Sequence, residues 1–335
     1  MNSKKLAILG LLILVISMSG CLNRAKTCGL TVSQTEGILI KRLEPSYFMV
    51  PVDDEIKVYM DVQNRGNSQA TNVKATLWAH AGFSILQDSA SPYDKAGTYV
   101  INYPLEAPRL DICSEGDVYT FEWALKAGCD PVETILAVYL DYDYSSYGYA
   151  KIPLASREQY ERTQGKLKAE GENFPSAGPI QVKIESIQAE PVLISETSND
   201  FSVRAIFTNT GPGLAGPKGM GDVGKVTMSL SGPCEFTKRN KYTMIDGEEK
   251  DLGTIWDEND KKRLVWPQNT VIMRSGDQEA MKIAYLEYDG DPTTFVEDVC
   301  RIEISSEYHY QTVESPGDKM GVYGSPSQIE TCLQG

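Results

Sequence analysis

Runs of alternating apolar and polar residues constrain the fold of this chain more than any other feature. The segment 56–62 reads IKVYMDV, and the same alternation recurs through both halves of the chain. A period of two residues places alternate side chains on opposite faces of a β-strand. Turn residues separate the runs at short intervals and no long stretch has a helical period, which is typical of β-sandwiches. The other alternating runs are 73–77, 118–125, 136–144, 180–187, 201–207, 226–230, 281–288 and 299–304.

Segments of the first half recur in the same order in the second half. Such a repeat predicts two copies of one β-domain. The paired segments are VQNRG (62–66) with FTNTG (207–211), VKATL (73–77) with VTMSL (226–230), VYLDYD (138–143) with AYLEYD (284–289), and YAKIPL (149–154) with VCRIEI (299–304).

The Asn-x-Gly after a strand, the strand that follows it and the late paired segment together resemble a known domain. They resemble the CARDB-like immunoglobulin-fold domains of bacterial and archaeal surface proteins, and related repeats in archaeal S-layer-type proteins. In this resemblance Asn64-Arg65-Gly66 and Asn209-Thr210-Gly211 are tight turns, where glycine or asparagine accepts a positive φ. The resemblance implies tandem immunoglobulin-like β-sandwiches, used mainly for adhesion, as scaffolds or as spacers.

The repeat divides the chain into an all-β architecture of two domains. We expect immunoglobulin-like β-sandwiches at 29–155 and 179–312, joined by a charged, partly helical connector at 156–178. The connector reads SREQYERTQGKLKAEGE before a proline- and glycine-containing loop. The segment 313–335 is expected to be a flexible tail unless Cys332 ties it down.

The N-terminus has the pattern of an export signal. Lys4 and Lys5 precede an apolar run at 6–17 that is too short for a membrane span. MSGC at 18–21 resembles a lipobox, in which the cysteine is lipidated and becomes the new N-terminus. We therefore expect a signal peptide at 1–20 and a lipid on Cys21 that holds the protein on the outer face of the cell membrane. A plain secretory signal with an incidental cysteine and an uncleaved anchor are the alternatives.

The remaining cysteines are even in number, which favours disulfides in an exported protein. Cys113 and Cys129 bracket a strand and lie too far apart to bond easily, so that Cys28 competes for either one. Cys234 with Cys300 is the preferred bridge, and each half has an odd count, which leaves room for one interdomain or tail bridge. The candidate disulfide cysteines are Cys28, Cys113, Cys129, Cys234, Cys300 and Cys332.

The net charge of −14 at pH 7 argues against anionic partners. A surface this acidic repels nucleic acid and anionic lipid head groups. The segment 211–225 (GPGLAGPKGMGDVGK) matches the letters of glycine-rich nucleotide loops, but those loops open a helix, whereas an alternating run follows here. We expect no nucleic acid and no nucleotide, and a flexible loop that can still carry binding.

Catalytic and metal chemistry have little support. His80 and His309 are the only histidines, and neither lies near a nucleophile motif. Without CxxC or Cys–His clusters, zinc is not expected. We expect no catalytic residue, no metal and no cofactor. Acidic clusters that could supply oxygens to calcium, or could simply be solvated turns, lie at 53–55, 141–143 and 289–291.

The tyrosine-rich segment 137–154 (AVYLDYDYSSYGYAKIPL) supplies the candidate binding residues. Its alternation places Leu140 and Tyr142 on the core face. We expect a turn at 144–149, so that the segment forms a hairpin. Tyr144 and Tyr147 at the tip of this hairpin are the candidate binding residues.

Three functions of different class follow. The favoured one is a lipid-anchored, non-catalytic surface protein for adhesion, envelope scaffolding or assembly, with envelope proteins, surface proteins or glycans as partners. The alternative is a lipoprotein that captures a small ligand or glycan, which needs an aromatic-lined pocket. A secreted hydrolase would need a convergent acid–base pair in a cleft. The host can be bacterial or archaeal, and the S-layer-type resemblance favours an archaeal one.

Overall fold

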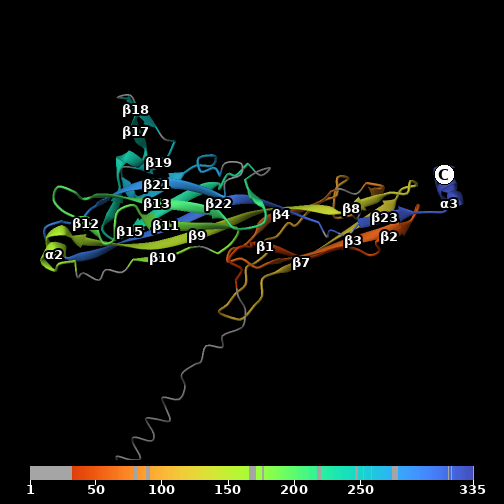
Figure 1. Ribbon diagram of the computed structural model, residues 1–335, viewed down its shortest axis with the longest axis horizontal. Coiled ribbons are helices and arrows are strands. Elements are labelled where there is room, and N and C mark those ends of the chain that lie inside the picture. The colour runs from red at the N-terminus through yellow and green to blue at the C-terminus, as the bar shows by residue number, and fades with distance from the viewer. Residues whose placement is uncertain are drawn as a thin grey trace, which may run out of the picture.

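The computed structural model describes residues 32–334, except 79–80, 88–90, 166–170, 176, 217–219, 246–247, 252, 258, 274–277, 316 and 318. Over these residues the chain is almost entirely antiparallel β-structure, in an elongated body with two sandwiches end to end (Figure 1). The prediction of an all-β chain with two tandem β-sandwiches is confirmed. Cys21 and Cys28 lie outside the described residues.

In the first sandwich, a four-stranded sheet packs against part of a ten-stranded sheet. The small sheet has the order β1-β3-β7-β5, and β6, β4 and the first half of β9 cover it. Trp123 on β7 reaches across and donates a 2.8 Å hydrogen bond to the Gly97 carbonyl beside β6. The strands are β1 (Ile38–Pro45), β3 (Glu55–Asn64), β4 (Thr71–Trp78), β5 (Phe83–Ile85), β6 (Thr98–Val100), β7 (Val118–Ala127) and β9 (Ala137–Ser156).

The second sandwich repeats this plan. Its small sheet, β11-β13-β21-β16, has the order of the first, and β22, β15 and β20 of the ten-stranded sheet cover it. The strands are β11 (Ile180–Ser186), β12 (Val192–Ile194), β13 (Asp200–Asn209), β14 (Leu214–Ala215), β15 (Lys225–Ser231), β16 (Cys234–Phe236), β19 (Ile255–Asp257), β20 (Asp260–Trp266), β21 (Glu279–Tyr288) and β22 (Glu297–Glu314). A short 3-10 turn, η2 (Lys238–Asn240), precedes a separate hairpin of β17 (Tyr242–Ile245) and β18 (Glu248–Asp251).

Two long strands run through both sandwiches and join them. β9 has 20 residues and β22 has 18, and they pair antiparallel from Glu297–Ala155 to Glu314–Val138 without a break in register. The first half of β9 also pairs with β4, whereas its second half pairs with β10 (Glu172–Phe174) and β12. A continuous hydrogen-bonded ladder therefore crosses the junction between the sandwiches.

This ladder corrects the predicted hairpin. Residues 144–149 are extended and paired with β22, so the segment has no turn and Tyr144 and Tyr147 lie at no hairpin tip. Serine and glycine suggested a turn, but the alternation of buried and exposed positions continues through them. The pairing of VYLDYD with AYLEYD is also wrong, because AYLEYD belongs to β21, whose counterpart in the first sandwich is β7. Both segments alternate, and alternation does not identify the partner strand.

The segment 156–178, predicted to connect the two domains, contains the expected short helix but does not lie between the sandwiches. α2 (Arg157–Arg162) follows β9 at the far end of the second sandwich (Figure 1). β10 then returns along β9 towards the junction. The segment therefore links two strands of the second sandwich, while β9 and β22 join the sandwiches. No helix in the described part of the chain is long and apolar enough to cross a membrane.

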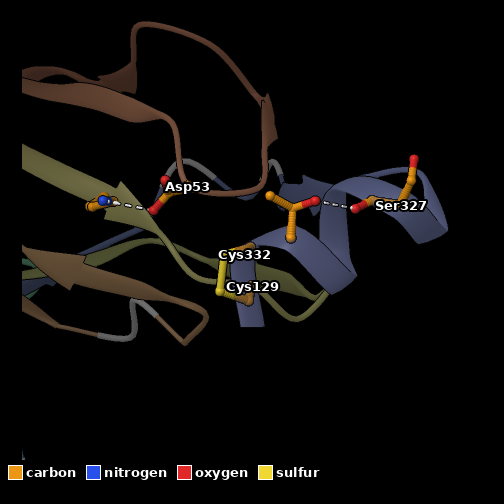
Figure 2. The surroundings of a disulfide bond; sticks show 6 residues. Asp53, Cys129, Ser327 and Cys332 are labelled. Atoms are coloured by element: carbon orange, nitrogen blue, oxygen red, sulfur yellow. Dashed lines mark hydrogen bonds and ion pairs between the residues drawn. A yellow bond between two sulfur atoms is a disulfide. The ribbon is translucent and has the colours of Figure 1, made fainter. Parts of the chain in front are cut away.

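The C-terminal segment returns to the first sandwich, contrary to the expected flexible tail. β23 (Lys319–Tyr323) pairs with β2 (Met49–Pro51) on one side and β8 (Glu133–Ile135) on the other. α3 (Pro326–Gln334) follows, and its Cys332 is bonded to Cys129, with their Cα atoms 5.5 Å apart (Figure 2). Backbone pairing and this bridge hold the segment in place, so Cys332 does tie the tail down.

Candidate functional site

Four tyrosines form the core of the junction between the sandwiches. Tyr142 and Tyr144 come from β9, and Tyr308 and Tyr310 come from β22. All four are buried, and their rings contact one another in a closed cycle with centroid distances of 5.7–6.4 Å. The inward face of the tyrosine-rich segment is therefore packing, as predicted for Leu140 and Tyr142.

We call Tyr142, Tyr144, Tyr308 and Tyr310 the tyrosine cluster. Hydroxyl groups of this cluster bind one loop from each sandwich. The Tyr144 hydroxyl accepts a 3.0 Å hydrogen bond from the Ser68 amide. The Tyr310 hydroxyl accepts a 2.8 Å hydrogen bond from the Gly213 amide and donates to Asn209. The two sandwiches thus present equivalent loops to equivalent tyrosines. Burial raises the pKa of Tyr144 to about 12 and also raises the pKa of Tyr310, so both stay protonated at neutral pH.

These contacts explain the glycines of the two Asn-x-Gly turns. Neither Gly66 nor Gly211 has a positive φ, so the predicted reason is wrong. A Cβ on Gly66 would overlap the Tyr144 hydroxyl, and one on Gly211 would overlap the Tyr310 hydroxyl. The close approach of the tyrosines therefore requires glycine. Asn64 is fully buried and donates to the Ser68 and Leu105 carbonyls, which closes the first of these loops.

On the outward face of the same strands, His309 lies between two carboxylates. Its Nδ1 atom is 3.0 Å from Asp143 and its Nε2 atom is 3.3 Å from Asp141. Gln311 donates to Asp141 and Asn72 donates to Asp143, each at 2.7 Å. The hydrogen bond to Asp141 is the main cause that raises the pKa of His309, and partial burial opposes it. The cluster favours a protonated imidazole.

A first groove, of about 1000 Å³, crosses the outward face at the junction. Its floor includes Asp143, Tyr147 and His309, and the segment 67–71 forms one wall. The other wall is formed by the turn at 267–269 and by four residues of the glycine-rich segment, which are Gly216, Asp222, Gly224 and Lys225. The buried Asp222 holds these two segments together, since it accepts from the amides of Gly224 and Asn269 at 3.0 Å. The loop predicted to carry binding therefore lines a groove.

A second groove, of about 710 Å³, lies beside the first on the second sandwich. Register places its outward side chains in two rows across the sheet. One row is Thr227, Ser305 and Tyr147; the other is Ser229, Glu303, Tyr149 and Phe174. Tyr147 and Asn67 line both grooves, so the two are continuous.

Of the two predicted binding residues, Tyr147 lies in this site and is 55% exposed. Tyr144 touches the first groove, but its side chain is buried in the tyrosine cluster. Sequence reasoning missed the other residues of the second groove. A signal was available: if the alternation of 137–144 is continued through the expected turn, Tyr147 and Tyr149 fall on one face. The residues that face them come from strands far away in the sequence, and only the register shows them.

The cysteines of the second sandwich do not form the preferred bridge. Cys234 and Cys300 are free thiols, fully buried between the two sheets. Burial is the main cause that raises the pKa of Cys234, and its hydrogen-bond contact with Cys300 adds to it. The sequence correctly suggested that the two cysteines lie near each other. It could not show whether their sulfur atoms have the geometry that a disulfide needs. Cys113 is disulfide-bonded.

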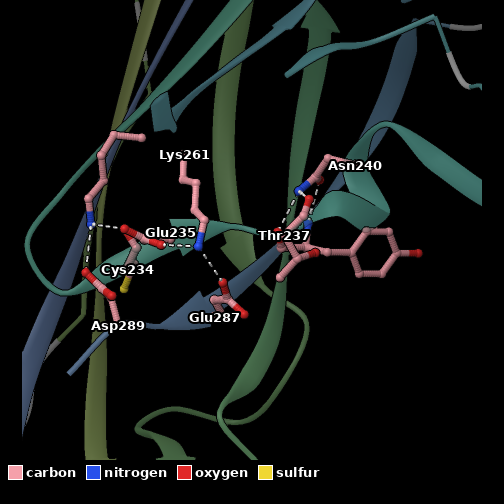
Figure 3. A network of polar contacts seen from close by, with 9 residues as sticks. Cys234, Glu235, Thr237, Asn240, Lys261, Glu287 and Asp289 are labelled. Carbon is pink, nitrogen blue, oxygen red and sulfur yellow. Dashed lines mark hydrogen bonds and ion pairs between the residues drawn. The ribbon is translucent and has the colours of Figure 1, made fainter. Parts of the chain in front are cut away.

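The backbone around Cys234 is clamped by ion pairs at the edge of the second sandwich (Figure 3). Lys261 on β20 lies 2.9 Å from Glu235 on β16 and 3.6 Å from Glu287 on β21. Lys262 lies 3.9 Å from Asp289 and donates to the Cys234 carbonyl at 2.6 Å. These contacts tie the two sheets of the sandwich to each other at this edge.

The three acidic clusters considered for calcium are engaged by protein cations in the structure. Asp53 pairs with Lys126 at 2.7 Å, Asp141 and Asp143 flank His309, and Asp289 pairs with Lys262. Within the described ranges, no group of three or more His, Cys, Asp or Glu side chains is arranged to hold a metal ion.

No protein-family model and no curated protein matches the chain. Among solved structures it is similar to the MSCRAMM ACE of Enterococcus faecalis, at 9% identity over 87% of this chain and 97% of that one, with a TM-score of 0.21. The full-length RrgB pilus protein from Streptococcus pneumoniae matches at 6% identity over 80% and 64%, with a TM-score of 0.21. Spo0M from Bacillus subtilis matches at 8% identity over 52% and 68%, with a TM-score of 0.20. Likenesses this weak carry no argument about function.

Proposed function

We propose that the protein is a lipid-anchored, non-catalytic module of the cell surface that acts as a rigid scaffold or adhesion element. The observation that carries this proposal is the unbroken β9–β22 ladder through both sandwiches. Domains joined by a flexible linker reorient freely. Here, bending at the junction would break backbone hydrogen bonds and expose the four buried tyrosines. The two sandwiches therefore keep one relative orientation, as a spacer or scaffold needs.

The disulfide that joins the loop after β7 to the C-terminal helix α3 supports an exported location. Cys129 and Cys332 are 203 residues apart in sequence, and their bridge holds the returning C-terminal segment. Structural disulfides persist outside the reducing cytosol. A signal peptide at 1–20 and a lipidated Cys21 would deliver the chain there.

The first described residues indicate where an anchor at Cys21 would attach to the elongated body formed by the two sandwiches, which we call the rod. Ser33 donates to the Arg65 carbonyl of the first sandwich, and the Gln34 carbonyl accepts from Gly178 and Gln181 of the second. The chain thus enters at the junction rather than at a tip. Extended chain between Cys21 and Val32 spans at most about 40 Å. The anchor would hold the rod by its middle, close to the membrane, with both tips free for envelope or surface partners.

The proposal is tested by photo-crosslinking in intact cells of the producing organism. A photoreactive residue placed at exposed Tyr47, at one tip, and at exposed Ile187, in the second sandwich, would capture neighbours. We expect envelope proteins or surface polymers at one or both positions, and mass spectrometry should find lipid on Cys21. The control variant Cys21→Ser should leave the membrane fraction and lose these neighbours. Recovery of soluble proteins alone, or of a mature chain without lipid, would contradict the proposal.

A further inference from the structure

We propose that the second groove binds a neutral saccharide chain. This inference goes beyond the scaffold role and does not depend on the lipid anchor. It rests on three properties of the groove: a cluster of exposed aromatic rings, a neighbouring set of hydroxyl groups, and the absence of a cation among its lining residues within the described part of the chain.

The aromatic side of the groove offers flat apolar surface to a ligand. Tyr149 and Phe174 are paired across β9 and β10, with ring centroids 6.1 Å apart and an interplanar angle of 29°. Phe174 is 58% exposed and Tyr147 is 55% exposed. Exposed aromatic residues gathered at one place indicate a binding site. A pyranose ring carries C–H groups on its faces, and aromatic faces with their partial negative charge suit such groups.

The part of the groove next to these rings is lined by small polar side chains. Thr227, Ser229 and Ser305 lie beside Tyr147 and Tyr149 in the two rows. Each hydroxyl can both donate and accept a hydrogen bond, which matches the hydroxyl groups of a sugar. Their small size beside large rings leaves the hollow of about 710 Å³. A few polar groups that converge on an apolar surface are the usual composition of a ligand site.

Charge distinguishes a neutral ligand from an anionic one. Glu303 is the charged side chain among the described residues that line the groove. Arg263 and Lys151 occupy positions on neighbouring strands, but neither lines the groove, and Lys151 is paired with Glu172. Phosphate and uronate groups are recognised by arginine or lysine contacts. With no cation among the described lining residues, the carboxylate of Glu303 repels such ligands and accepts hydrogen bonds from neutral hydroxyls.

The continuity of the two grooves argues for a chain rather than a single sugar. Tyr147 lies where they meet, and the first groove continues over Asp143 and His309 to the 67–71 loop. The described basic residues that line the first groove, His309 and Lys225, lie beside carboxylates: His309 beside Asp141 and Asp143, and Lys225 opposite Glu307 in the sheet. An extended ligand could contact both sandwiches at once. Because the ladder fixes the two sandwiches, such a site needs no rearrangement on binding.

The test is isothermal titration of the full chain in a detergent without a sugar head group. The neutral probes are cellotetraose, chitotetraose and mannotetraose, and the anionic probe is tetragalacturonate. We expect at least one neutral probe to bind, and Tyr147→Ala and Tyr149→Ala each to weaken it about tenfold. Tyr147→Phe keeps the ring and should retain binding within about threefold. Tyr139→Ala is the matched control, because Tyr139 lies on the same strand and outward face but contacts Trp78 outside both grooves.

Several results would overturn the inference. These are no binding of any neutral probe, tighter binding of tetragalacturonate, or binding that survives both alanine substitutions in chains with unchanged unfolding midpoints. Self-association of the wild-type chain that Tyr147→Ala abolishes, without sugar binding, would make the groove an interface between copies. None of these results bears on Cys21 or on neighbours found in cells, so a failure here and a failure of the scaffold role are distinguishable.

Discussion

The Nδ1 atom of His309 on β22 lies 3.0 Å from a carboxylate oxygen of Asp143, its direct partner across the ladder on β9. Asp141 approaches the other ring nitrogen at 3.3 Å. A neutral imidazole has one N–H and can donate to one of the two carboxylates only, whereas the protonated ring donates to both. The junction of the two sandwiches therefore contains a group whose protonation strengthens contacts along the ladder.

We predict that stability falls as pH rises through the pKa of His309. The folded pKa is raised above the ordinary value of about 6.5, so the stabilisation is fully present below that value and is lost above the folded pKa. Because the cluster is partly exposed, the loss should be up to about 1 kcal/mol. Urea unfolding of wild type and His309→Gln from pH 5 to 9 measures it. The difference between the two should shrink at high pH, and an NMR pKa at or below 6.5 for His309 would contradict the prediction.

We predict that removing one hydroxyl from the tyrosine cluster lowers the free energy of unfolding. Tyr310→Phe leaves the Gly213 amide and the Asn209 side-chain oxygen without their partner. Unsatisfied groups of this kind cost about 1–3 kcal/mol, so the free energy of unfolding should fall by that amount. Tyr147→Phe is the control, because its exposed hydroxyl should matter by less than about 0.5 kcal/mol. Equal stability of both variants would show that the hydroxyl of Tyr310 does not hold the loop.

The C-terminal bridge predicts a larger effect. The Cys129–Cys332 disulfide closes a loop with a sequence separation of 203, and loss of such a bridge typically costs about 2–5 kcal/mol. The double variant Cys129→Ser/Cys332→Ser should unfold at lower urea concentration, with faster hydrogen exchange in β23. Thr331→Ala, at the neighbouring exposed position of α3, should change stability by less than about 0.5 kcal/mol. Unaltered exchange in β23 would mean that strand pairing alone holds this segment.

We predict that the buried thiols of Cys234 and Cys300 react slowly with thiol reagents in the native state. Cys234 and Cys300 are inaccessible, and burial raises the pKa of Cys234, so little thiolate is present. A maleimide reagent should label neither residue in the native protein and both in urea, as mapped by peptide mass spectrometry. Rapid native labelling, or a Cys234–Cys300 cross-linked peptide before reduction, would be the contrary result.

Particular residues show how far the sequence could predict the site. Alternation correctly placed Leu140 and Tyr142 in the core. Tyr147 was expected at the tip of a hairpin, whereas it lies on the outward face of β9, where the grooves lie. Alternation could not show that Ser305 and Thr227 face Tyr147, because these residues come from strands about 80 or more positions away. The reason for Gly66 and Gly211 was equally hidden, since it depends on tyrosine hydroxyls from distant strands.

The amino-acid sequence by itself determined that the chain is all-β, that it holds two similar sandwiches, and which face of most strands is buried. The strand class and the buried faces follow from local alternation, and the two copies follow from the two segment matches that the structure supports, VQNRG with FTNTG and VKATL with VTMSL. Only the tertiary structure decided that β9 continues through the expected turn, that β22 accompanies it across both sandwiches, and that the C-terminal segment returns to the first one. A period of two residues specifies a face but not a partner, and the partner is chosen by the packing of the whole sheet.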